Sequence, residues 1–251
     1  MTFTDRRILT TLVAAIFASP TFAQTHLVPE PSIYAPLMDF QPNYMKIELR
    51  VFAPAFDGSV RARAIVEPSF SSEFAVGIRQ DAGAYSVFYY VAPEHLWDYA
   101  VLELMKKGEI TSSQGGKSTT AEDITKLQAS LPADPASIKL VRCETPIDPE
   151  LANSIIGIWK YVLLQTRYDE TTTLGVDGDT YHLSMEINHD SFAGQVWSPP
   201  ENADVGRAVD LIYTIKNVCT KEHNVSLETL RSQVADLTKR FQIVLHPETT
   251  K

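Results

Sequence analysis

The sequence has no excess of basic side chains and, after its first 23 residues, no long apolar run. Its 22 Lys and Arg face 31 Asp and Glu, which leaves a formal net charge of −9 at pH 7. Nucleic-acid binding needs clustered cations that neutralise phosphates, so we expect no nucleic-acid partner. A membrane-spanning helix needs about 20 consecutive apolar residues, so we also expect no membrane insertion of the mature chain.

The sequence also lacks the motifs that accompany the commonest kinds of catalysis. It contains no G-x-S-x-G for a serine nucleophile and no H-E-x-x-H for a zinc site. Residues 114–118, QGGKS, contain part of a phosphate-loop pattern, but Thr111 stands where that loop has its first glycine. We therefore predict no catalytic residue, no metal and no cofactor.

The order of charged, apolar and small residues at the start of the chain is typical of a secretory signal peptide. Asp5-Arg6-Arg7 is followed by a mainly apolar run over 8–19 and by Thr21-Phe22-Ala23, which resembles a cleavage site. We predict cleavage after Ala23, and hence a periplasmic or secreted protein without a lipid anchor, because no cysteine lies near the cut. The alternative is an uncleaved membrane anchor, for which a run of about a dozen residues is too short.

Cysteine is scarce, since only Cys143 and Cys219 occur. Export to an oxidising compartment would favour a single disulfide between them, and this is the prediction that we adopt. The alternative is a pair of buried thiols at unrelated positions.

Alternation of apolar and polar residues predicts strands in three parts of the chain. An extended, proline-rich arm over 24–43 comes before the first of them. The predicted strands are a four-stranded antiparallel meander over 44–52, 60–66, 73–80 and 84–91, a strand over 137–143, and a hairpin over 179–198.

The most apolar segment, 148–168, predicts a helix at the centre of the core. Asp148 suits the N-cap and Pro149 the first helical position. A stripe at helical spacing follows, formed by Leu151, Ile155, Ile158, Trp159 and Val162. Further helices are predicted over 93–108, 121–129, 205–219 and 227–241.

Antiparallel-looking clusters of strands, separated by helices, favour an α+β fold. We expect a mostly antiparallel sheet that packs against the central apolar helix and the two C-terminal helices. Residues 44–251 are predicted to form a single domain, with a candidate lobe boundary near 112–120.

The polar cluster of greatest interest lies on the 179–198 hairpin. His182 and Glu186 share one face of a strand about 13 Å apart, which is too wide for both to bind one zinc ion. His189 lies at the turn, and Trp197 could form an exposed recognition edge, because tryptophan is common in binding hot spots. A solvated hairpin face is the simplest explanation, and a ligand- or partner-binding surface is the functional hypothesis.

The export signal, the well-patterned core and the missing motifs favour a protein that acts by non-catalytic binding. Its partner would be a protein or a small molecule in the cell envelope, and an inhibitor or immunity protein would fit this description. The alternative is a hydrolase whose site is assembled around residues 180–198, with His182, Glu186 and His189 as first candidates. A deep cleft that holds two of these side chains within hydrogen-bond reach would favour the hydrolase, and a flat surface would favour binding.

Overall fold

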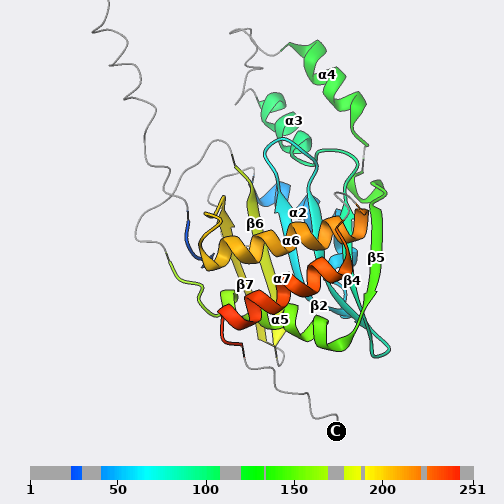
Figure 1. The fold of residues 1–251 in the computed structure, drawn as a ribbon. Coiled ribbons are helices and arrows are strands. Elements are labelled where there is room, and N and C mark those ends of the chain that lie inside the picture. Colours follow the sequence, from blue (N-terminus) through cyan, green and yellow to red (C-terminus); the bar gives the residue numbers. More distant parts are fainter. Residues whose placement is uncertain are drawn as a thin grey trace, which may run out of the picture.

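The computed structural model describes residues 24–29, 41–107, 120–132, 134–168, 178–187, 190–221 and 225–243. Within these ranges the chain forms one antiparallel sheet of seven strands, with helices packed on both of its faces (Figure 1). This arrangement confirms the predicted α+β fold. The signal peptide, nearly all of the loop at 112–120 and His189 lie outside the described ranges, so the statements about them stay predictions.

The sheet joins the N-terminal meander to the hairpin near the C-terminal third of the chain. Its strands are β1 (Val28–Pro29), β2 (Val60–Glu67), β3 (Phe74–Asp81), β4 (Ala84–Val91), β5 (Val141–Ile147), β6 (Thr180–Ile187) and β7 (Asp190–Trp197). Their order in space is β1-β7-β6-β2-β3-β4-β5, and every neighbouring pair runs antiparallel. The 179–198 hairpin is therefore present as β6 and β7, and β2 connects it to the rest of the sheet.

Two groups of helices cover the two faces of the sheet. The described helices are α2 (Gln41–Val51), η1 (Ala53–Phe56), α3 (Trp97–Lys107), α4 (Ala121–Ser130), η2 (Pro135–Ser137), α5 (Pro149–Leu163), α6 (Asp204–Thr220) and α7 (Leu227–Arg240). Helices α5, α6 and α7 enclose the larger core on one face, and α2, η1 and α3 enclose a smaller core on the other. Among the described residues, no helix combines the length and the apolar character needed to cross a membrane.

Helix α5 is the predicted central helix. The Asp148 carboxylate accepts a hydrogen bond from the Leu151 backbone N–H at 2.9 Å, as an N-cap does. Ile155 and Trp159 are 0% and 1% exposed, because α5 lies between the sheet and the C-terminal helices. The prediction of a core helix that is covered on two sides is therefore confirmed.

The strand predicted over 44–52 is wrong, because Gln41–Val51 forms α2. The buried positions of this segment are Tyr44, Glu48, Val51 and Phe52, which follow a helical spacing. Two of these four buried side chains, Tyr44 and Glu48, carry polar groups and so do not stand out in the sequence as core positions. The remaining apolar residues of the segment then fall at every second position, which is the pattern of a strand. The N-terminal meander consequently consists of β2, β3 and β4, and α2 lies across the sheet as a covering helix.

The predicted disulfide is also wrong, because Cys143 and Cys219 are free thiols. Packing of α6 on β5 brings them together, but the Cys143 thiol donates a hydrogen bond to the Cys219 carbonyl oxygen at 3.0 Å. The Thr145 hydroxyl lies 3.9 Å from Cys143 Sγ and 3.8 Å from Cys219 Sγ. Burial raises the pKa of the Cys219 thiol, so this group stays protonated and resists oxidation.

Candidate functional site

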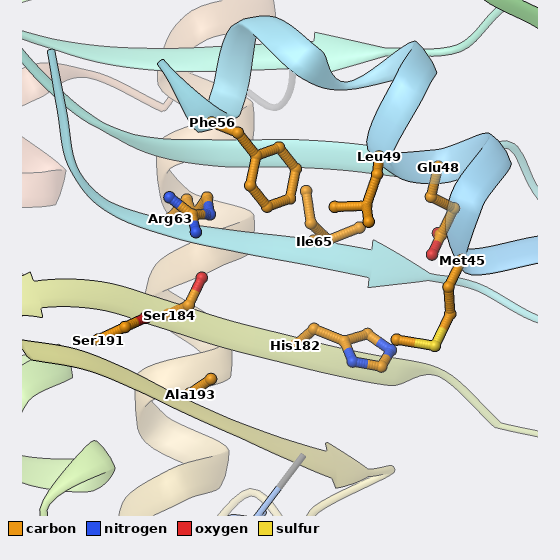
Figure 2. A pocket seen from close by; sticks show the side chains of 10 residues that line it. All are labelled: Met45, Glu48, Leu49, Phe56, Arg63, Ile65, His182, Ser184, Ser191 and Ala193. Carbon is orange, nitrogen blue, oxygen red and sulfur yellow. The ribbon is translucent and has the colours of Figure 1, made fainter. Parts of the chain in front are cut away.

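A cavity of about 120 Å³ lies between α2 and the strands β2, β6 and β7 (Figure 2). Its apolar lining consists of Met45, Leu49, Phe56, Ile65 and Ala193, and its polar lining of Glu48, Arg63, His182, Ser184 and Ser191. An apolar cavity of about 150 Å³ holds a benzene molecule. The present cavity is somewhat smaller, so it has room for a ligand no larger than about one small ring.

The register of the strands determines which side chains form the floor of this cavity. Ile65 on β2 pairs with His182 on β6, and Arg63 pairs with Ser184. Residues two apart on a strand point to the same face of the sheet, so these four side chains all lie on the side that α2 covers. Ser184 in turn pairs with Ala193 on β7, which extends the floor by one strand.

Helix α2 and the turn η1 form the roof. Met45, Glu48 and Leu49 lie three and four residues apart, so they share the helix face that points to the sheet. Phe56, at the end of η1, lies over Arg63, whose guanidinium carbon is 4.1 Å from the ring centroid. The roof is thus apolar except for the carboxyl group of Glu48.

A chain of titratable groups runs along one side of the cavity. His182 Nε2 lies 3.1 Å from Glu67 Oε1, and Glu48 makes a side-chain hydrogen bond with Glu67. Burial, together with the charge of Glu67, raises the pKa of Glu48 well above its usual value. Burial opposes the ionisation of Glu67, but the charge and hydrogen bond of His182, with the hydrogen bond from Glu48, lower its pKa. Glu48 is therefore a neutral acid that donates to an ionised Glu67.

The second carboxyl oxygen of Glu48 is a buried hydrogen-bond acceptor that is not used within the described residues. Glu48 is only 7% exposed, and its Oε1 atom has no hydrogen-bond partner within the part of the chain that the structure describes. Leaving such a group unsatisfied costs about 1–3 kcal/mol, so buried atoms of this kind call for an explanation. Because Glu48 lines the cavity, a hydrogen-bond donor inside it would satisfy the atom.

A buried carboxylate, Glu73, fixes α2 against α3. Glu73 is 1% exposed and accepts hydrogen bonds from the Tyr44 hydroxyl at 2.7 Å and from the backbone N–H groups of Leu96 and Trp97 at 2.7 and 2.9 Å. Burial and the nearby carboxylates raise the pKa of Tyr44, so its hydroxyl remains a donor. The start of α2 is thereby tied to the start of α3, which holds the roof in place.

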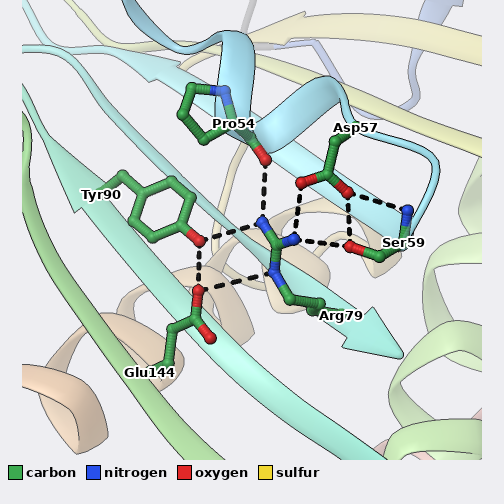
Figure 3. A network of polar contacts seen from close by, with 6 residues as sticks. All are labelled: Pro54, Asp57, Ser59, Arg79, Tyr90 and Glu144. Carbon is green, nitrogen blue, oxygen red and sulfur yellow. Dashed lines mark hydrogen bonds and ion pairs between the residues drawn. The ribbon is translucent and has the colours of Figure 1, made fainter. Parts of the chain in front are cut away.

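Arg79 on β3 fixes the other end of the roof (Figure 3). Its guanidinium donates to the Pro54 carbonyl oxygen at 2.9 Å and pairs with Asp57 at 2.6 Å, one residue beyond η1. Burial opposes the ionisation of Asp57, but hydrogen bonds from Ser59 and Arg79 lower its pKa to about 2. The same guanidinium reaches Tyr90 at 3.0 Å, so η1 is anchored to the middle of the sheet.

The structure places only one of the four predicted site residues in the cavity. His182 lines it, whereas Glu186 lies exposed further along β6. Trp197 is half-buried at the end of β7, where its backbone N–H donates to Gln24 at 2.7 Å. His189 lies outside the described residues.

Sequence reasoning missed three titratable residues of the site, Glu48, Arg63 and Glu67. One signal in the sequence pointed to this site. Arg63 and Glu67 flank Ile65 on one face of a strand, and an isoleucine between them indicates that this face is covered; in the structure Ile65 is indeed buried. Within the described residues, no group of three or more His, Cys, Asp and Glu side chains has a geometry that could hold a metal ion.

Comparison of the chain with protein-family models, with curated proteins and with solved structures finds no match in any of the three.

Proposed function

We propose that this chain is an exported protein, periplasmic or secreted, that binds a small organic molecule in the cavity between α2 and the sheet. The observation that carries the proposal is a cavity with apolar walls on which a few polar groups converge. Small-molecule sites have this composition, in which apolar walls supply affinity and a few polar groups supply orientation. The roof is held by a buried polar network at one end and by a partly exposed one at the other, which supports a site that is formed before a ligand arrives.

This site supports the small-molecule form of the binding hypothesis over the protein-binding form. An inhibitor or immunity protein acts through an outer surface, and the 179–198 hairpin was the predicted surface. His182 instead points beneath α2, and Trp197 is half-buried, so the hairpin offers no cluster of exposed anchors among its described residues.

A hydrolase is the second candidate, because His182 and Glu67 form the kind of pair that orients a general base. Two hydroxyl groups, those of Ser184 and Ser191, line the same cavity. Turnover of nitrophenyl esters that falls in both His182→Ala and Glu67→Gln would favour this candidate. Binding of ligands without turnover would favour the first.

Filling the cavity is expected to abolish ligand binding. We expect single-ring compounds to bind the wild-type protein in a saturation-transfer NMR screen, and the Ala193→Phe variant to lose these hits, because the added ring occupies the cavity floor. Ala84→Phe is the matched control, since Ala84 is exposed on β4, a strand that contributes no residue to the cavity lining. Hits that survive in Ala193→Phe, or a wild-type protein without hits, would contradict the proposed function.

Export is expected to remove the first 23 residues. Intact-mass spectrometry of the protein recovered from a secreting bacterial host should give a chain that begins at Gln24. A chain that still begins at Met1 would contradict the export part of the proposal.

A further inference from the structure

One end of the cavity presents an unused hydrogen-bond acceptor to the molecule that fills it. Glu48 projects from α2 and lines the cavity beside Met45 and His182, as Figure 2 shows. Its Oε1 atom is buried and has no hydrogen-bond partner among the residues that the structure describes, and the whole residue is only 7% exposed. An acceptor in this position is satisfied by a donor that the occupant of the cavity brings with it.

The carboxyl group of Glu48 offers this acceptor without a negative charge. Burial and the charge of Glu67 raise the pKa of Glu48, so its proton remains in the hydrogen bond to Glu67. Glu67 carries the negative charge of the pair, and that charge already faces His182 Nε2 at 3.1 Å. A ligand cation would therefore give up its hydration without gaining a counter-charge from Glu48, which is a costly exchange. A neutral donor fits this end of the cavity better.

The volume of the cavity limits the rest of the ligand. About 120 Å³ is less than the roughly 150 Å³ of a cavity that holds benzene, which favours a ligand smaller than a substituted benzene ring. A hydroxyl is a compact neutral donor, and a short alkyl chain that carries one has fewer heavy atoms than benzene. The side chains of Met45, Leu49 and Ile65 give such a chain an apolar surface to contact.

We propose that the ligand is a small neutral aliphatic alcohol. Its hydroxyl donates to Oε1 of Glu48, and its alkyl chain packs against Met45, Leu49 and Ile65 beneath α2. This inference rests on the proposed function and adds the chemical class of the ligand. Water is the competing occupant, because it also donates to Oε1, but it gives the apolar walls fewer dispersion contacts than an alkyl chain does.

Two isomers test the hydroxyl directly, because n-butanol and methyl n-propyl ether contain the same atoms and only the alcohol has a hydrogen-bond donor. Each is titrated into the mature chain, and NMR follows the methyl groups of Met45, Leu49 and Ile65, with Leu237 in the core on the opposite face as the reference. We expect the alcohol to bind about tenfold more tightly than the ether, which is the usual effect of one hydrogen bond. The cation n-butylamine should bind more weakly than the alcohol.

Two substitutions of Glu48 separate its acceptor oxygen from its proton. Glu48→Gln keeps a carbonyl oxygen and still donates to Glu67 through its amide, so the preference for the alcohol should remain. Glu48→Leu removes the oxygen, and the affinities for the two isomers should then agree within about twofold. Circular dichroism checks that both variants are folded, and the comparison of the isomers in the wild type needs no variant.

Equal affinity of the wild type for the two isomers would overturn the ligand class and would mean that Oε1 keeps a water molecule. Tighter binding of n-butylamine, or loss of the preference in Glu48→Gln, would overturn it as well. These results leave small-molecule binding standing, because the compounds still shift the methyl groups of the cavity. Absence of any shift, both with these compounds and with the single-ring compounds of the wider screen, would overturn the proposed function itself.

Discussion

Replacing Trp159 with alanine is expected to lower the free energy of unfolding by about 3–5 kcal/mol, the usual range for loss of a large buried aromatic side chain. Trp159 is 1% exposed on α5, the helix that both the sheet and α7 cover. A void at this position removes contacts with both layers at once, and the surrounding elements cannot all collapse into it. Urea unfolding followed by circular dichroism measures the loss.

Two variants separate packing from other effects of the Trp159 substitution. The indole Nε1 of Trp159 is buried without a hydrogen-bond partner in the described fold, so Trp159→Phe gives up volume but also removes an unsatisfied donor. We expect its cost to stay below about 1.5 kcal/mol. Leu164→Ala, at the exposed end of the same helix, should stay within about 0.5 kcal/mol of wild type. A loss below about 1.5 kcal/mol for Trp159→Ala, which is the usual cost of a conservative swap, would contradict the central position of α5.

The central helix could be predicted because its signals are local. Asp148, Pro149 and the apolar stripe lie within one segment, and each favours a helix for its own physical reason. Strand β6 was predicted on similar grounds, because its alternation of apolar and polar residues also lies within a short stretch. Strand β7 was predicted from the turn before it and from Pro199-Pro200 after it.

Helix α2 could not be predicted in this way, because its buried face is partly polar. Tyr44 and Glu48 point into the protein, where Glu73 and Glu67 give them hydrogen-bond partners. Those partners come from β2 and from the residue just before β3, so the sequence of α2 alone does not show why polar side chains are buried. Counting only apolar positions then leaves Met45, Ile47, Leu49 and Val51, which imitate a strand.

The site was missed for a related reason. His182 was singled out, but its partner Glu67 lies on β2, and only the antiparallel pairing of β2 with β6 brings the two together. Arg63 and Ser184 meet through the same pairing. A sequence pattern shows which face of a strand each side chain lies on. It does not show which strand lies next to it or in which register, so it could not place these side chains beside one another.

Glu48→Gln is expected to make the protein more stable than the wild type, by a margin that grows as the pH rises. The folded protein keeps the Glu48 proton at pH values at which the unfolded chain has already released it, because the folded pKa is raised. The wild type therefore loses about 1.4 kcal/mol per pH unit between the ordinary glutamate pKa and the raised one. Glutamine has no proton to release, and its amide still donates to Glu67.

The groups around Glu48 determine this sign. Burial raises the pKa of Glu48 most. The charges of Glu67 on β2 and of Glu73, just before β3, raise it further, and the charge of His182 on β6 lowers it. Glu67 acts in the other direction, because its pKa is lowered, so the stability that it contributes is lost as the pH falls through that lowered value. The contribution of these two carboxyl groups to stability is therefore greatest near the ordinary glutamate pKa and falls on either side of it.

Urea unfolding of wild type and Glu48→Gln at several pH values from about 5 to about 8 measures the difference between their free energies of unfolding. The prediction concerns how this difference changes with pH, not its absolute size. Glu186→Gln is the control, since Glu186 is exposed on the strand that carries His182, and its effect should stay within about 0.5 kcal/mol at each pH. A difference between wild type and Glu48→Gln that is the same at every pH would mean that Glu48 ionises alike in the folded and unfolded chains. Glu48, which lines the cavity, would then carry a negative charge next to that of Glu67.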